Sequence, residues 1–151
     1  MTIWVDADAC PVVIRDILFR AARRARIVVT FVANKTLAVP ASPYIKTLQV
    51  ATLIDAADQA IVDRVTPEDL VITADIPLAA LVVRKGAQAL SPRGILFDRE
   101  TIGPHVAMRD FLTELRNTGT PTGGPAILTL VDRQNFANRL DAWLAQHQAP
   151  S

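Results

Sequence analysis

The sequence predicts an α/β fold: a three-layer α/β/α domain with a mainly parallel central sheet. Short apolar runs alternate along the chain with longer segments whose apolar residues recur at helical spacing. Alternating strands and helices are typical of parallel sheets covered by helices on both faces. Pro11 and Pro77 each follow a predicted strand by a few residues, and proline is favoured in the first turn of a helix.

The predicted strands are apolar or β-branched runs of four to six residues. They cover Thr2–Asp6, Ile27–Val32, Ile45–Val50, Leu70–Thr73, Ala87–Leu90 and Ile95–Asp98. The last two flank the turn sequence S-P-R-G and therefore predict a hairpin.

The predicted helices occupy the segments between and after these strands. They cover Val12–Arg26, Ala56–Val65, Pro77–Lys85, Gly103–Asn117 and Asp132–Gln146. Gly86 ends the third helix, and Asp132 is the expected N-cap of the last. Thr118–Pro125 is rich in glycine and proline and predicts a loop. We expect a single domain over residues 1–151, in which 119–151 form a C-terminal loop and helix packed on the core.

The composition is typical of a single globular domain and gives no sign of a membrane protein or a secreted one. The chain has 151 residues, of which 50% are hydrophobic and 21% charged, as expected for one globular domain. No apolar run approaches the roughly 18 residues of a membrane span, so no membrane association is expected. The N-terminus lacks the basic region of a signal peptide, and the lone Cys10 cannot form an internal disulfide. These features favour a cytoplasmic protein. The net charge of +1 gives no global basic field that would require nucleic acid.

Four aspartates are the candidate catalytic and metal-binding residues: Asp6, Asp8, Asp58 and Asp75. The carboxyl ends of the strands form the ligand crevice of an open α/β sheet. Carboxylates gathered there repel each other unless a proton or cation lies between them, and oxygen-only ligands suit Mg²⁺ or Mn²⁺. The sequence therefore predicts a divalent-metal site for phosphoryl chemistry.

Each aspartate also has a structural interpretation. If the chain stays extended after Asp6, Asp8 points to the same side, whereas the alternative makes Asp8 the N-cap of the first helix. Asp75 is equally suited to be an N-cap. Asp58 shares a helix face with Ile61, where a carboxylate is costly to bury, but a capping box with Asp55 would also explain it.

Other polar residues have secondary roles in this prediction. Thr73, Arg93 and Arg109 are candidates for substrate contact, and Cys10 is expected to be a small packed residue. The two histidines lack zinc-site spacing, and no glycine-rich phosphate loop is present. No zinc and no nucleotide cofactor is therefore expected.

Several motifs resemble the bacterial YaiI/YqxD family, a family of unknown function that is similar to PIN and NYN nucleases. They are V-D-A-D-A-C-P-V, D-A-A-D-Q-A-I-V, D-L-V-I-T-A-D-I-P-L-A, S-P-R-G, M-R-D-F-L-T-E-L-R and T-G-G-P with D-R-Q-N-F, and they cover nearly the whole chain in order. The resemblance implies a PIN-like fold in which Asp6, Asp58 and Asp75 match the nuclease acids and Asp8 a frequently polar position. Many PIN domains carry a further acid where this chain has Pro77, which weakens the case for a second metal site.

The function predicted from these features is an Mg²⁺- or Mn²⁺-dependent nuclease or phosphodiesterase, with RNA as the expected partner. Asp6 and Asp75 would be the principal ligands, and Asp8 and Asp58 would bind a second ion or orient water. Two alternatives remain open. One is a phosphatase of the haloacid-dehalogenase type built on D-A-D, although no G-D-x-x-x-D element follows Lys85. The other is a non-catalytic nucleic-acid or protein binding module with a vestigial metal site.

Overall fold

A computed structural model describes residues 1–123 and 127–147 of the chain. Its centre is a six-stranded sheet with the strand order β3-β2-β1-β4-β5-β6. The strands are β1 (Thr2–Asp6), β2 (Val28–Ala33), β3 (Ile45–Gln49), β4 (Leu70–Ile72), β5 (Gln88–Leu90) and β6 (Leu96–Phe97). All neighbouring pairs are parallel except β5 with β6, which are antiparallel. The predicted α/β class and the terminal hairpin are confirmed.

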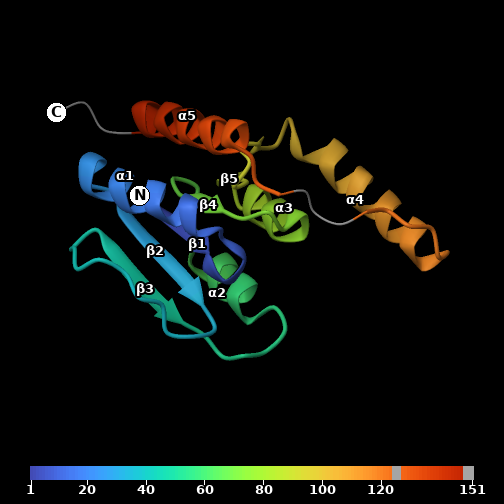
Figure 1. Ribbon diagram of the computed structural model, residues 1–151, viewed down its shortest axis with the longest axis horizontal. Helices are drawn as coiled ribbons and strands as arrows, with labels where there is room; N and C mark the ends of the chain where they lie inside the picture. The colour runs from blue at the N-terminus through green and yellow to red at the C-terminus, as the bar shows by residue number, and fades with distance from the viewer. Residues whose placement is uncertain (124–126, 148–151) are drawn as a thin grey trace.

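Helices flank the sheet on both faces (Figure 1). In the described part of the chain they are α1 (Val12–Ala25), α2 (Ala56–Arg64), α3 (Ile76–Arg84), α4 (Ile102–Asn117) and α5 (Leu130–His147), preceded by a short 3₁₀ helix, η1 (Ala7–Ala9). Most boundaries lie within one or two residues of the predicted ones because they depend on local apolar periodicity. Residues 124 and 125 of the predicted loop lie outside the described residues.

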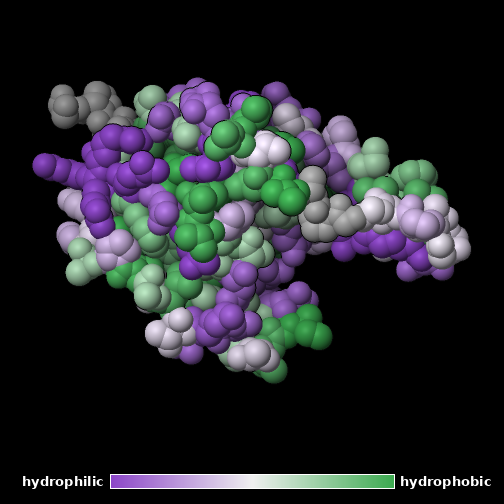
Figure 2. All heavy atoms as spheres, in the orientation of Figure 1, coloured by the Kyte–Doolittle hydropathy of each residue, from purple (hydrophilic) through white to green (hydrophobic). Residues whose placement is uncertain are grey.

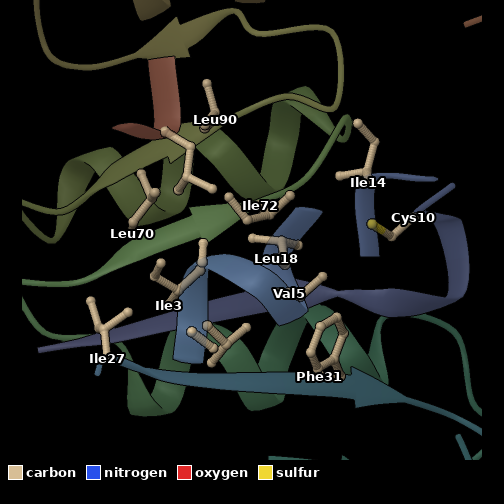
Figure 3. Close-up of a cluster of buried hydrophobic side chains, with 14 of the residues drawn as sticks. Ile3, Val5, Cys10, Ile14, Leu18, Ile27, Phe31, Leu70, Ile72 and Leu90 are labelled. Atoms are coloured by element: carbon tan, nitrogen blue, oxygen red, sulfur yellow. The ribbon is translucent and has the colours of Figure 1, made fainter. Parts of the chain in front are cut away.

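One face of the sheet packs against α1 and α5. Alternate residues of β1, Ile3 and Val5, are fully buried there, and Phe31 of β2 joins them. Helix α1 contributes Leu18, and Figure 3 shows these side chains converging between the strands and the helix. Helix α5 closes the cluster with four buried side chains, Phe136, Leu140, Trp143 and Leu144.

The opposite face packs against α2 and α3. Val32, Val71 and Ala89 point to this side and meet Ile61 of α2 and Leu78 of α3, all buried. The two faces therefore use alternate residues of the same strands, as the period of two in a strand requires. Because both faces are covered, the central strands are mostly apolar.

The turn before β6 brings the sheet edge directly against α5. Gly94 has a positive φ of 86°, and a Cβ atom placed on it would lie 2.6 Å from the backbone carbon of Asn135. Any other residue would therefore strain the turn and clash with the helix backbone. The glycine of the S-P-R-G turn lets α5 pack close to the sheet.

Helix α4 differs from the other helices. None of its residues is buried, and in Figure 1 it extends away from the body of the molecule. Met108 and Phe111 on this helix are more than half exposed. Within the described residues, no helix combines the length and the apolar character that crossing a membrane requires.

The start of α5 corrects one prediction. The helix begins at Leu130, so Asp132 lies in its first turn and is not the N-cap. Thr129 and Asp132 instead bind each other's backbone: Asp132 N donates to Thr129 Oγ1 over 3.1 Å, and Thr129 N donates to Asp132 Oδ2 over 3.0 Å. This reciprocal arrangement is a capping box, with threonine as the cap.

Candidate functional site

Asp6 lies at the carboxyl end of β1, and its nearest polar neighbour comes from β4. The hydroxyl of Thr73, which directly follows β4, donates to Asp6 Oδ2 over 3.0 Å. Burial raises the pKa of Asp6, the Thr73 hydrogen bond opposes this rise, and the charges of Asp75 and Asp8 add to it. Because β1 and β4 are adjacent parallel strands, residues 67 positions apart in sequence meet at one edge.

Asp75 lies beside this pair at the start of α3. Its backbone N–H donates to Thr73 Oγ1 over 3.0 Å, and its Oδ1 accepts the N–H of Leu78 over 3.1 Å. The predicted N-cap interpretation is therefore correct for one oxygen of Asp75. The same carboxylate raises the pKa of Asp6, so Asp75 both caps a helix and belongs to the acidic group. Thr73 Oγ1 thus connects the carboxylate of Asp6 to the backbone N–H of Asp75.

Asp58 reaches this edge from α2. It is partly buried on the face that also carries Ile61, whereas Asp63 is exposed and accepts from Gln59 Nε2 over 2.7 Å. Burial raises the pKa of Asp58 to about 6, and the charges of Asp75, Asp6 and Asp55 contribute in that order. Asp55 makes no side-chain hydrogen bond to α2, so the capping-box interpretation of Asp58 is wrong.

Asp8 occupies the rim of the group. The chain does not stay extended after Asp6, as one prediction required, because residues 7–9 wind into η1. Asp8 is not a helix cap either, since Pro11 precedes α1 without a side-chain cap. Its exposed carboxylate accepts the N–H of Asn34 at the end of β2 over 2.9 Å.

Together the four aspartates form a partly buried acidic group at the carboxyl end of β1 and β4, which we call the acidic edge. Asp6 and Asp58 have raised pKa values with like charges among the causes, which means that the group favours protons or cations. Within residues 1–123 and 127–147, no three His, Cys, Asp or Glu side chains stand in a group that could hold a metal ion. The acidic edge can therefore attract a cation, but it is not a preformed cage of three protein ligands.

The predicted arginines lie outside the acidic edge. Arg93 Nη1 pairs with Asp132 Oδ2 at 2.5 Å and so links the S-P-R-G turn to the start of α5. Arg109 lies on α4, is about half exposed, and has a 3.5 Å contact with Asp110.

Cys10 is buried, as its interpretation as a packed residue requires. Its thiol pKa is raised to about 12, chiefly by burial, so the thiol stays protonated at neutral pH. A protonated thiol is neither a nucleophile nor a metal ligand.

One buried carboxylate was missed by sequence reasoning. Asp69 precedes β4, is 5% exposed, and lies at the amino end of the sheet. It accepts three N–H groups: the backbone of Thr2 at 2.9 Å, the indole of Trp4 at 3.0 Å and the backbone of Thr66 at 2.9 Å. The turn sequence T-P-E-D was the available signal, but it identifies only the bond to Thr66, three residues away.

Comparisons with known proteins place these residues in a family. The model of the family described as "Uncharacterized BCR, YaiI/YqxD family" matches residues 4–146. A UPF0178 protein of Proteus mirabilis is 57% identical over 148 residues, covering 98% of each chain. A UPF0178 protein of Thioalkalivibrio sulfidiphilus is 58% identical over 146 residues, covering 97% of this chain and 99% of that protein. No solved structure matches the chain.

Proposed function

The chain belongs to the YaiI/YqxD family, which is described as uncharacterized, and for this member we propose an Mg²⁺- or Mn²⁺-dependent phosphodiesterase activity on RNA. The observation that carries the proposal is the meeting of Asp6, Asp58 and Asp75 at one sheet edge. They come from a strand, a helix and a strand-to-helix turn. Burial raises the pKa values of Asp6 and Asp58, and the charge of Asp75 adds to the rise in both. Repulsion between these carboxylates costs stability in the metal-free protein, and a divalent cation bound between them would relieve it.

The donor set of the acidic edge fits a hard divalent cation. All its side-chain donors are carboxylate or hydroxyl oxygens, which Mg²⁺ and Mn²⁺ prefer. Mg²⁺ usually keeps several waters and takes one or two protein carboxylates together with substrate phosphate oxygens. Asp6 and Asp75 suffice for such a site, so a cage of three protein ligands is not required.

In this proposal each residue of the acidic edge would have a separate role in hydrolysis. Asp6 and Asp75 would hold the ion, which when bound lowers the pKa of water and neutralises charge on the phosphate. Thr73, buried between them, fixes one oxygen of Asp6 through its hydroxyl and the backbone N–H of Asp75 through its Oγ1. Asp58 and the exposed Asp8 flank this pair and would orient the attacking water or hold a second ion.

RNA is the proposed substrate because of the resemblance to PIN and NYN nucleases and the absence of a nucleotide-binding loop in the sequence. The 16 Lys and Arg side chains are balanced by 15 Asp and Glu, so no net basic field attracts the phosphates and substrate binding should be weak.

Cleavage of a labelled single-stranded RNA panel with Mn²⁺ tests the proposal. Asp6→Asn should reduce cleavage by at least about 100-fold, because ion binding contributes several kcal/mol to the transition state. Asp63→Asn, an exposed carboxylate on the outer side of α2, is the matched control and should keep full activity. EDTA should abolish cleavage by the unmodified protein.

Two outcomes would contradict this function. Cleavage that survives Asp6→Asn would come from a contaminating nuclease. RNA binding in EDTA, with no turnover on any RNA after Mn²⁺ is added, would instead identify a binding module with a vestigial metal site.

A further inference from the structure

A pocket of about 420 Å³ lies next to the acidic edge. Ala9 and Ala74 line it, and they are the direct neighbours of Asp8 and Asp75 in the sequence. From there the pocket extends past the end of β5 to Phe97 of β6 and His105 of α4. A molecule in this pocket would therefore lie beside the aspartates proposed to act on a phosphodiester.

The walls of the pocket are mostly apolar. Ile76 at the start of α3 and Leu128 before α5 contribute aliphatic surface, and Phe97 contributes a buried aromatic ring. Figure 2 shows apolar side chains gathered in the middle of this face of the molecule. Pockets of a few hundred Å³ with apolar walls and few polar groups are typical of small-molecule sites.

Two polar side chains in the pocket are suited to the edge of a flat ring. Ser91 is 6% exposed, and its Oγ accepts the N–H of Arg93 at 3.2 Å and of Ile95 at 3.1 Å. A serine hydroxyl has two acceptor positions and one donor, so these bonds leave its hydrogen to be donated. His105 is held edge-on to Phe97, with ring centroids 4.9 Å apart and a 90° interplanar angle.

We propose that this pocket binds the base of a nucleotide whose phosphate lies at the acidic edge. The apolar walls suit the faces of a base, and the Ser91 hydroxyl and the His105 imidazole suit its polar rim. This inference rests on the proposed function, because a phosphodiester at the acidic edge is what brings a base to the pocket. It adds that the substrate is recognised through an unstacked base as well as through its backbone.

The two histidines of the chain provide a direct test. The Hε1 signals of His105 and His147 are followed by NMR while adenosine, uridine or free ribose is added in EDTA. His147 is stacked on Trp143 at 4.4 Å in α5 and does not line this pocket, so it serves as an internal reference. Adenosine and uridine should shift the His105 signal saturably through the ring current of the bound base. His147 should stay in place, and ribose should move neither signal.

Two variants with matched exposure locate the binding. Ile95 lines the pocket and is 42% exposed, whereas Leu81 on α3 is 41% exposed and lies outside it. Ile95→Trp should fill part of the pocket and weaken adenosine binding roughly tenfold, the loss expected when one base loses its stacking contacts. Leu81→Trp should leave the affinity unchanged.

Three results would overturn the base pocket: no His105 shift with either nucleoside, equal shifts of both histidines, or an affinity for adenosine that Ile95→Trp does not reduce. Because nucleosides carry no phosphate and the titration contains EDTA, failure here would leave RNA cleavage at the acidic edge standing. Conversely, a loss of cleavage activity alone would leave the nucleoside result intact.

Discussion

Each end of the central strands carries an aspartate, buried at the amino end and half-buried at the carboxyl end, and the two have opposite environments. At the amino end, Asp69 accepts three N–H donors from Thr2, Trp4 and Thr66 and ties β1 to the residues before β4. At the carboxyl end, Asp6 accepts the hydroxyl of Thr73 and faces the charges of Asp75 and Asp8.

This difference separates a structural carboxylate from a functional one. A buried carboxylate stabilises a fold when enough donors surround it, and it costs stability when like charges do. Asp69 is satisfied within the protein, whereas Asp6 would gain from a cation that the protein itself does not supply. The comparison therefore assigns the two residues by their neighbours: three N–H donors around Asp69, and one hydroxyl with two like charges around Asp6.

Removing each carboxylate in turn should give the largest difference in the free energy of unfolding between the two ends of the sheet. In EDTA at neutral pH, Asp69→Ala should lower the free energy of unfolding by about 3–5 kcal/mol, because three N–H groups lose their acceptor. Asp6→Asn should change it by less than about 1 kcal/mol, since it removes a repelled charge and keeps the shape. Urea denaturation measures both. A larger loss for Asp6→Asn than for Asp69→Ala would reverse the assignment.

Adding Mn²⁺ tests whether the carboxylates at the carboxyl end of the sheet bind a cation. An ion that binds only the native state at a hundredfold excess over Kd stabilises it by about 2.7 kcal/mol, so the Tm should rise. Asp75→Asn should blunt this rise while keeping the helix cap, because asparagine is also a good N-cap. Asp63→Asn should show the full rise. A Tm that stays constant across millimolar Mn²⁺ would argue against cation binding at the acidic edge.

The smallest expected effect is the pH dependence contributed by Asp58. Its pKa is about 6 in the folded protein, against 3.8 as the ordinary value, so the native state binds the extra proton between these two pH values. The stability of the metal-free protein should therefore fall as the pH rises from about 4 to about 6.

Asp58→Asn should remove this contribution. The variant should match the unmodified protein at about pH 4 and exceed its stability at pH 7.5 by about 1 kcal/mol, a value reduced from the full shift because solvent screens a partly exposed carboxylate. Urea denaturation across this range, with Asp63→Asn as the control, measures the difference. Identical pH profiles for the two variants would place Asp58 outside the electrostatic group.

Local sequence signals determined most of the fold. Apolar runs and helical periodicity predicted the strands and helices, and S-P-R-G predicted the turn before β6, because these features depend on residues a few positions apart. The same signals placed Asp6 at a strand end and Asp75 at a helix start. They failed at Asp132, where the neighbouring Thr129 competes for the cap, and after Asp6, where the chain turns into η1.

Only the tertiary structure decided which polar groups meet. Thr73 reaches Asp6, and Thr2 reaches Asp69, each across 67 residues, because β1 and β4 are neighbours in the sheet. The pocket beside the acidic edge likewise combines the ends of β4 and β5 with α4 and Leu128. Periodicity and capping describe contacts within one element. The donors around a buried carboxylate are set by strand order and packing, and these depend on the whole chain.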